Sequence, residues 1–291
     1  MNMTITLDHP LVATDWLAEH CRSEDIRILD CSLVMKQSED GSYGFSSGRD
    51  IWKEGHIPNS IYVDLGEELS DQNHEFSLMM PAVEDFAETL RQKGIGDDTC
   101  VICYDRTNQA WAARVWWMLR VCGFDNAAVL NGGWKKWTAE GKEISTEESS
   151  YPPAQHFSVN HRPALMVDKH EVKTACDEPE TLLLHSLPLP IFTGEVNPYK
   201  RAGRIPGSKN LYCETLIDPQ SNCYAETEII AEKFGPSGSL KKNRVITYCG
   251  GGIAASSNAL ALTLIGVDNV AVYDGSLTEW TADPDMPMET D

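Results

Sequence analysis

The chain has 291 residues, of which 42% are hydrophobic and 23% charged, as is typical of soluble globular proteins. Its 24 Lys and Arg against 44 Asp and Glu give a formal net charge of −20, which argues against nucleic acid and anionic lipid as partners because both require a basic face. No run approaches the roughly 18 apolar residues that span a membrane, and no secretory signal is visible, so we expect a cytoplasmic protein with no nucleic-acid or membrane partner.

In the first half of the chain, short apolar runs alternate with helical patterns. A strand is expected at 26–31 and a second at 61–63, directly after a Gly-x-Ile-Pro turn at 55–58. The elements expected next are a helix at 83–93, a strand ending at Asp105, a helix at 109–122, a strand at 127–130 and a Gly-rich turn followed by Trp137.

The second half of the chain repeats this order. The turn Gly55-His56-Ile57-Pro58 recurs as Gly203-Arg204-Ile205-Pro206, and Gly123-Phe124-Asp125-Asn126 recurs as Gly266-Val267-Asp268-Asn269. We infer a tandem duplication of a domain of about 130 residues. The expected strands are 181–186, 209–212, one ending at Cys249, and 270–273, with helices at 227–234 and 254–265.

Strands that alternate with helices predict the α/β class, with a parallel sheet covered by helices on both faces in each copy. A polar segment that contains Pro152 and Pro153 separates the copies. The chain therefore divides into an N-terminal domain at 1–145, a linker at 146–163 and a C-terminal domain at 164–291. In such sheets a ligand binds at the carboxyl ends of the strands, which is where Cys249 falls.

Cys249 ends an apolar strand and is followed by three glycines and a helix-forming segment. A glycine loop that enters a helix directs backbone N–H groups and the positive end of the helix dipole at one point. A thiolate at that point is favoured. The pattern predicts a nucleophilic cysteine in a cradle formed by Gly250, Gly251, Gly252, Ile253, Ala254 and Ala255.

Other interpretations of this stretch fit the residues less well. A buried structural cysteine is the common case, but it needs no glycines and no helix start. A cysteine phosphatase requires an arginine six positions after Cys249 to clamp phosphate, and that position is Ala255. The Lys-Ser/Thr ending of a phosphate-binding loop is also absent.

Nine cysteines are scattered along the chain. Their odd number, without a signal peptide, indicates reduced thiols and no disulfide framework. Cys100 and Cys103 have the spacing of a redox or zinc motif, but they lie in a β-branched run and no second ligand pair stands at zinc spacing. We expect core packing for this pair and no metal site.

With the repeat, the Gly-x-Ile-Pro turns, the Arg114–Met118 helix segment and the Cys249 loop together, the sequence resembles the two-domain rhodanese family over nearly its whole length. These are the thiosulfate and 3-mercaptopyruvate sulfurtransferases. The resemblance implies that Cys249 carries a persulfide inside its six-residue loop. Asp105 stands at the matching place in the first copy, which implies that this copy is catalytically silent and forms the other wall of an inter-domain cleft.

The resemblance implies a two-stage cycle without metal or organic cofactor. The Cys249 thiolate attacks the outer sulfur of a small anionic donor, and sulfite or an enolate-like anion leaves. Backbone N–H groups of the loop stabilise the persulfide. A thiol or cyanide acceptor, or a thioredoxin-like protein, then removes the sulfur.

The chain departs from the family pattern in two places. Two residues after the cysteine the family presents a basic residue or a serine, and this chain has Gly251. The family also carries donor-binding arginines at and shortly after the first strand of the second domain, where this chain reads Leu184-His185-Ser186-Leu187. Replacements for these arginines are expected among Lys200, Arg201 and Arg204, although solvated surface charges are an equal alternative for these three residues.

Three hypotheses follow. The first is a sulfurtransferase that uses 3-mercaptopyruvate or thiosulfate as donor. The second is a non-catalytic persulfide carrier or interaction module that receives sulfur from a partner protein, which the missing arginines favour. The third is redox sensing by a reactive cysteine, which needs a nearby resolving thiol such as Cys213.

Overall fold

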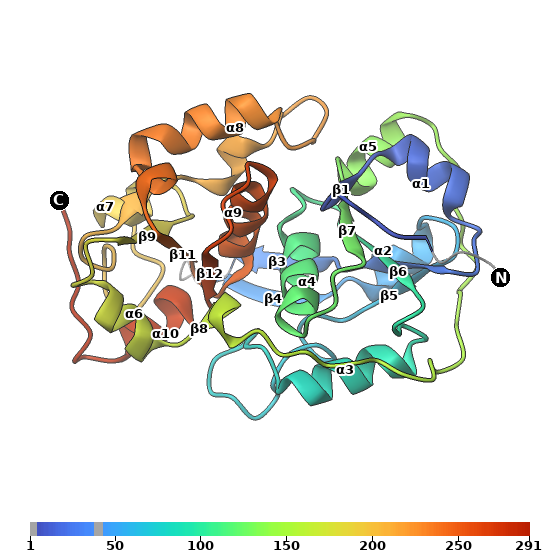
Figure 1. Cartoon of the computed structure of the whole chain (residues 1–291), viewed down its shortest axis with the longest axis horizontal. Helices are drawn as coiled ribbons and strands as arrows, with labels where there is room; N and C mark the ends of the chain where they lie inside the picture. Colours follow the sequence, from blue (N-terminus) through green and yellow to red (C-terminus); the bar gives the residue numbers. More distant parts are fainter. Residues whose placement is uncertain (1–4, 38–42) are drawn as a thin grey trace.

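The computed structural model describes residues 5–37 and 43–291. Two α/β domains lie side by side along the long axis of the molecule (Figure 1). Among the described residues, no helix is both long and apolar enough to cross a membrane.

Each domain is built on a five-stranded parallel sheet, and the two sheets have the same strand order. This agreement confirms the tandem α/β architecture and the duplication. The first sheet runs β1 (Leu11–Val12), β7 (Ala127–Leu130), β6 (Cys100–Tyr104), β2 (Ile26–Asp30), β5 (Ser60–Tyr62). The second runs β8 (Met166–Val167), β12 (Val270–Tyr273), β11 (Arg244–Tyr248), β9 (Thr181–His185), β10 (Lys209–Asn210).

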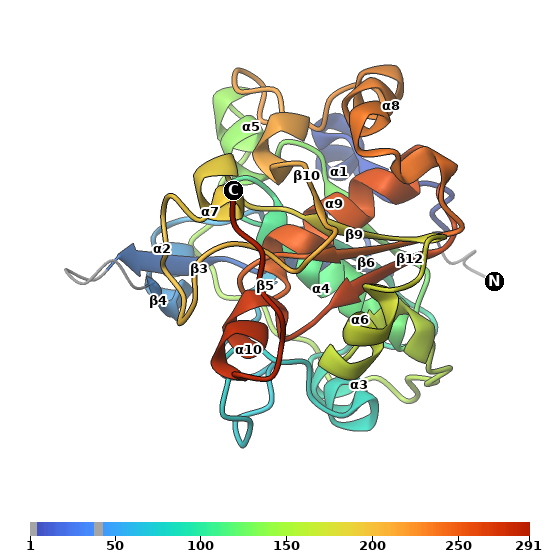
Figure 2. The same ribbon diagram turned by 90° about the vertical axis from the view of Figure 1, so that its left-hand side faces the viewer.

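Helices cover both faces of each sheet, as the alternating pattern predicted. Figure 2 shows α8 and α9 on one side of the second sheet and α6 and α10 on the other. In the first domain the helices are α1 (Thr14–His20), α2 (Arg49–Glu54), α3 (Val83–Gln92), α4 (Ala110–Val121) and α5 (Gly133–Ala139). In the second they are α6 (Lys169–Ala175), α7 (Leu189–Thr193), α8 (Thr227–Phe234), α9 (Ile253–Leu264) and α10 (Ser276–Ala282), with short 3-10 turns at Pro163–Leu165, Cys213–Leu216, Gly235–Ser237 and Ser239–Lys241.

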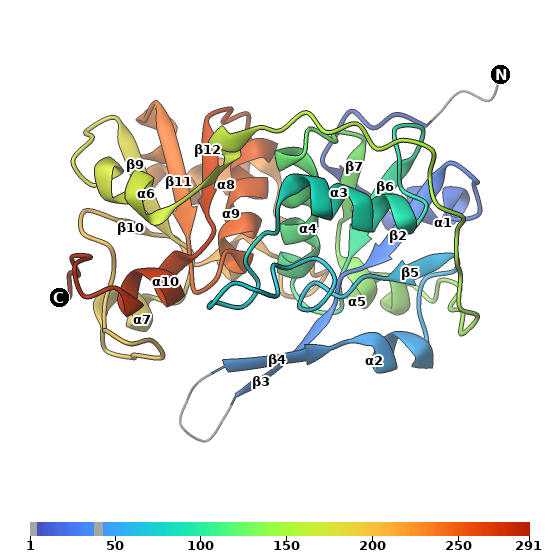
Figure 3. The ribbon, with the colours of Figure 1, turned by 90° about the horizontal axis from the view of Figure 1, so that it is seen from below.

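The first domain carries one addition that the repeat did not predict. Strands β3 (Leu33–Gln37) and β4 (Tyr43–Ser47) form an antiparallel ribbon outside the parallel sheet, and Figure 3 shows it along the lower edge of that view, beside α2. Phe45, in the middle of β4, packs edge-on against Trp111 of α4, with ring centroids 5.4 Å apart.

One hydrophobic core runs through both domains. It includes Phe86 from α3, Trp117 from α4 and Leu260 from α9, together with Cys249, and α4 packs against α9. The outer face of each sheet has a separate core, around Trp137 in the first domain and Trp280 in the second. Because the inner core is shared, the inter-domain interface is fixed by apolar burial.

The predicted linker runs along the first domain. Ala154 N donates to Arg91 O at 2.8 Å, and Asn160 N donates to Cys122 O at 2.8 Å. The domain boundaries at 145 and 163 stay a prediction, since residues of the linker are hydrogen-bonded to the first domain.

Candidate active site

Cys249 lies at the carboxyl end of β11, a central strand of the second sheet, and only 2% of it is exposed. The chain then turns through Gly252, whose φ of 78° is left-handed and therefore suits glycine. Helix α9 begins at the next residue. The strand, loop and helix start predicted from the sequence are thus present in that order.

The loop leaves most of its N–H groups available. In the part of the chain that the structure describes, Gly250, Gly251, Ile253, Ala254 and Ala255 have no acceptor for their backbone N–H groups. Gly252 is the exception, because its N–H donates to Ser276 Oγ at 3.2 Å. Of the six predicted cradle residues, five therefore keep an N–H group for a bound anion, at a helix start where anions are favoured.

Ser276 anchors the loop from the second domain's last strand-turn. Its hydroxyl donates to Tyr273 O at 2.7 Å and accepts from the N–H groups of Cys249, at 3.0 Å, and Gly252. The neighbouring Leu277 N donates to Cys249 O at 3.0 Å. Ser276 was not among the predicted site residues.

A buried ion pair between the two domains lies against the Cys249 loop. Arg114 of α4 is fully buried and pairs with Asp274, and its Nη2 also donates to Leu78 O at 3.1 Å. A Cβ on Gly252 would lie 2.9 Å from Arg114 Nη1, so glycine is needed there for space as well as for φ. The pair holds a cation next to the cradle, with its charge balanced by Asp274.

Tyr199 is a further residue that the sequence analysis did not assign to the site. A Cβ added to Gly250 would lie 2.3 Å from the Tyr199 hydroxyl oxygen. The hydroxyl therefore lies against Gly250, the residue that follows Cys249 in the chain. Tyr199 belongs to the long segment between α7 and the Gly-x-Ile-Pro turn, where the donor-binding residues were sought.

Arg201 and Arg204 are both held by partners within the second domain, and their predicted role toward a donor stays a prediction. The Arg201 guanidinium donates to the carbonyl oxygens of four residues near α10, at distances of 2.6 to 3.0 Å: Trp280, Thr281, Asp283 and Met286. Arg204 pairs with Glu289 at 2.6 Å and Asp291 at 2.8 Å, and it lies over the Phe192 ring. Both side chains therefore tie the last residues of the second domain in place. Lys200 is exposed, and its predicted role stays a prediction.

Arg204 has a counterpart in the first domain that explains its role. His56 stands at the same place in the other Gly-x-Ile-Pro turn, and its two ring nitrogens lie 2.8 Å and 3.0 Å from the acceptor carbonyl oxygens of Trp52 and Glu147. Each residue also exchanges two backbone hydrogen bonds with the segment that follows its domain's last helix, His56 with Ser145 and Arg204 with Glu289. These turns secure the ends of the two domains.

His185 and Cys213 are buried near the loop. Burial lowers the pKa of His185 to about 3, so the imidazole is neutral, and it packs edge-on against Phe192 and Tyr248. Burial also raises the pKa of the Cys213 thiol, and the proximity of Cys249 adds to this effect. Cys213 is thus near Cys249 but is held as a thiol, which does not favour a rapidly resolving partner.

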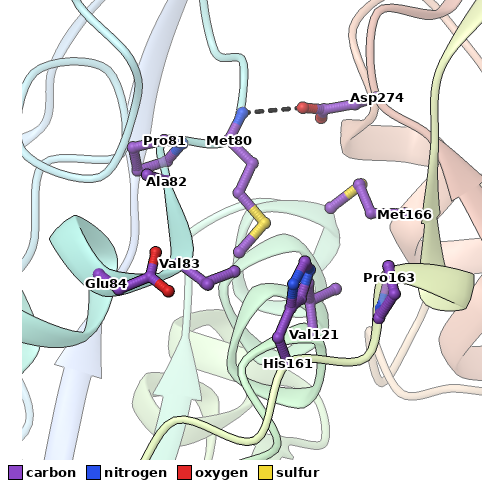
Figure 4. A pocket seen from close by; sticks show the side chains of 10 residues that line it. All are labelled: Met80, Pro81, Ala82, Val83, Glu84, Val121, His161, Pro163, Met166 and Asp274. Carbon is purple, nitrogen blue, oxygen red and sulfur yellow. Dashed lines mark hydrogen bonds between the residues drawn. The ribbon is translucent and has the colours of Figure 1, made fainter.

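A pocket of about 380 Å³ opens between the domains, next to the ion pair. Figure 4 shows Met80, Met166 and His161 around it, with Asp274 accepting from Met80 N. None of the loop residues 249–255 lines the pocket, so it is separate from the predicted donor site. Across the described residues, no group of three or more His, Cys, Asp and Glu side chains is arranged to hold a metal ion.

Comparison with known proteins places this geometry in context. Residues 13–140 and 193–283 match the family described as Rhodanese-like domain. The chain is 33% identical to the 3-mercaptopyruvate sulfurtransferase of Escherichia coli K12, over 96% of this chain and 97% of that protein. It is 30% identical to the thiosulfate sulfurtransferase of Gallus gallus, over 94% of each. The crystal structure of SseA from Escherichia coli matches with a TM-score of 0.81 at 30% identity, covering 92% of this chain and 98% of that one.

Proposed function

Because the chain belongs to the rhodanese-like family and is a sulfurtransferase, we propose that Cys249 is the residue that carries the transferred sulfur. The observation that carries this proposal is the set of five N–H groups around Cys249 that have no acceptor in the described residues. A persulfide anion, Cys249–S–S⁻, is the species that such donors stabilise best.

The first half-reaction follows from these groups. The Cys249 thiolate attacks the outer sulfur of a small donor, a new S–S bond forms, and the donor's bond to that sulfur breaks. Thiosulfate then leaves as sulfite, and 3-mercaptopyruvate leaves as the enolate of pyruvate, which takes up a proton. Gly250, Gly251, Ile253, Ala254 and Ala255 donate to the sulfur that gains negative charge, while Gly252 keeps the loop closed through Ser276.

The second half-reaction regenerates the thiolate. A thiol, cyanide or the dithiol of a thioredoxin-like protein attacks the outer sulfur of the persulfide, and the Cys249 thiolate leaves. We place this cycle in the cytoplasm, and we assign the catalytic part to residues 164–291. The first domain contributes Arg114 to the wall behind the loop, whereas its own loop carries Asp105 and no thiol.

Intact-mass analysis tests this assignment directly. The reduced protein is exposed separately to thiosulfate and to 3-mercaptopyruvate, beside the variants Cys249→Ser and Cys213→Ser. We expect the wild type and Cys213→Ser to gain one sulfur atom and Cys249→Ser to gain none.

Uptake by Cys249→Ser would refute the assignment. If the wild type gains no sulfur from either small donor, the donor assignment fails. A persulfide-bearing protein is then the next donor to test, because a carrier would accept sulfur from a partner protein.

A further inference from the structure

Arg114 joins the first domain to the turn that anchors the Cys249 loop. Its guanidinium is fully buried and pairs with Asp274, which stands two residues before Ser276 in the second domain. The other carboxylate oxygen of Asp274 accepts from Met80 N at 2.8 Å (Figure 4). Because both oxygens of this carboxylate are bonded to the first domain, the first domain fixes where the turn lies.

Ser276 has a backbone conformation that is costly for any residue with a side chain. Its φ of 49° is left-handed, and its counterpart in the repeat is Gly133, with a φ of 56°. Glycine adopts this conformation readily, whereas serine is strained in it. The serine hydroxyl offsets the strain by accepting from the N–H groups of Cys249 and Gly252. The strained residue of this turn is thus the one that holds the loop.

A second strained residue contacts the same guanidinium. Leu78 is buried with a φ of 67°, which is rare for a bulky side chain, and its carbonyl oxygen accepts from Arg114 Nη2 at 3.1 Å. Arg114 Nη1 lies against Gly252, where a Cβ would be 2.9 Å away. Strained backbone persists where the surrounding structure holds it, and it is common at functional sites. One side chain here holds segments of both domains against the loop.

We propose that Arg114 is a positioning residue for sulfur transfer. It fixes the turn that carries Ser276 and the Gly252 end of the loop, and it thereby aims the loop N–H groups at the Cys249 sulfur. This inference rests on the proposed role of Cys249 and gives the first domain a part in it. Arginine is required because its planar fork meets a carboxylate, a carbonyl oxygen and the Gly252 backbone together, which the single ammonium of lysine cannot do.

The test compares Arg114→Lys with the matched control Arg120→Lys. Arg114→Lys keeps the positive charge, so Asp274 stays balanced. Arg120 lies on the same helix α4, and its Nη1 donates to Thr263 Oγ1 of α9 at 3.1 Å, so the control alters an inter-domain contact at the far ends of the same two helices. Circular dichroism and thermal unfolding establish that each variant is folded.

Sulfur uptake is followed in a single turnover by intact mass, over a range of 3-mercaptopyruvate concentrations and, separately, of thiosulfate concentrations. Arg114→Lys should lower the limiting rate constant about tenfold, because N–H groups displaced from the developing charge lose much of their effect. The half-saturating donor concentration should change by less than about twofold, since Arg114 is fully buried and acts through the loop. Arg120→Lys should change neither quantity.

Ser276→Ala tests whether Arg114 acts through the turn. This variant removes the hydroxyl that anchors the loop and leaves Arg114 in place. In Arg114→Lys combined with Ser276→Ala, the loss of rate should be much smaller than the product of the two single losses. In Arg120→Lys combined with Ser276→Ala, the losses should multiply.

Hydrogen exchange of peptides that cover residues 249–256 gives a measurement that does not depend on sulfur chemistry. Exchange there should be faster in Arg114→Lys than in the wild type or in Arg120→Lys. If the wild type gains no sulfur at Cys249, the proposed role of Cys249 fails. The exchange rates then decide alone whether Arg114 holds the loop, and unchanged rates would overturn the inference.

Equal rate constants in the two lysine variants would also overturn it, as would losses that multiply between Arg114→Lys and Ser276→Ala. A raised half-saturating concentration with an unchanged rate constant would show that Arg114 binds the donor directly, which is contrary to the proposal. If Arg114→Lys does not fold, Asp274→Asn replaces it in every comparison, because it weakens the same pair from the second domain.

Discussion

The two domains contain the same strand–loop–helix unit in two states. In the first, β6 leads through Asp105 to α4, and in the second β11 leads through Cys249 to α9. The residue before each helix has a left-handed φ, 68° at Gln109 and 78° at Gly252. Trp134 N donates to Asp105 O at 3.0 Å, as Leu277 N donates to Cys249 O at 3.0 Å.

The units differ in what fills the cradle. The Asp105 carboxylate accepts from the N–H groups of Thr107, Gln109 and Ala112, at 2.7 to 3.1 Å, and from the Thr107 hydroxyl at 3.0 Å. Around Cys249 the matching Ala255 N–H has no acceptor in the described residues. The first loop thus holds its own carboxylate, whereas the second has no side-chain anion among the matching donors, as the proposed binding of a persulfide requires.

This comparison shows that the fold holds an anion at this point in the first copy, and it supports the proposal that the second copy keeps its cradle for a bound anion. The comparison also explains what the Asp105 loop of the first domain contributes to the structure. Gln109 Nε2 donates to Asn222 O at 2.5 Å, and Asn222 Nδ2 donates to Thr107 O at 2.9 Å. The Asp105 loop, whose N–H groups are occupied by its own carboxylate, therefore supports the segment 213–224. This segment begins at Cys213, near Cys249. It is joined to α9 by the Tyr224–Ser257 hydrogen bond.

The largest effect is expected from copying the first loop into the second. Cys249→Asp should abolish sulfur transfer, because the nucleophile is lost and a carboxylate fills the cradle. It should also be more stable than Cys249→Ser by about 1 to 3 kcal/mol, the range for hydrogen bonds to a charged group. Urea unfolding of the two inactive variants measures the difference. Equal or lower stability of Cys249→Asp would contradict the view that the N–H groups converge on an anion.

Removal of the Asp105 carboxylate should destabilise the first domain. Asp105→Ala leaves two buried N–H groups and one part-buried N–H group without their acceptor, and we expect a loss of about 3 kcal/mol in the free energy of unfolding. Asp105→Asn keeps one oxygen acceptor and should lose less. Since the silent loop supports Asn222, kcat should fall in Asp105→Ala while Cys249 still takes up sulfur. An Asp105→Ala protein as stable as the wild type would show that this carboxylate does not hold the loop.

The sequence predicted the repeated frame well, because each half carries the same periodic elements and turns. The helix predicted at 109–122 is observed at Ala110–Val121, and the one predicted at 254–265 at Ile253–Leu264. The β3–β4 ribbon was missed because it has no counterpart in the second half. The short edge strands β1 and β8 were also missed, since two residues give no periodicity.

Within the site, local pattern gave Cys249 and its loop but not the partners brought there by tertiary packing. Ser276 and Arg114 approach the loop from distant parts of the chain. Arg201 was one of three candidates for binding the donor, because a cation is the usual way to bind an anionic donor. Its actual acceptors are carbonyl oxygens at the end of α10, and backbone carbonyls carry no signal in the sequence that would identify them as partners.

The smallest effect on stability is expected at Gly250, which differs from the adjacent Gly251 in the space available for a side chain. The first loop has Arg106 directly after Asp105, with its guanidinium over the Trp134 ring, whereas the second has Gly250, where a Cβ would meet the Tyr199 hydroxyl at 2.3 Å. Gly250→Ala should therefore destabilise the protein by about 1 to 3 kcal/mol through overpacking.

Gly251→Ala is the matched control, because a Cβ there meets nothing within 4 Å and its φ is not left-handed. Its stability should equal that of the wild type. Adding Tyr199→Phe to Gly250→Ala removes the hydroxyl and should restore part of the lost stability, which thermal unfolding of the single and double variants would measure. If the loss persists undiminished in the double variant, the hydroxyl of Tyr199 is not what requires glycine at position 250. The difference between the two loops at this position would then need a cause other than space.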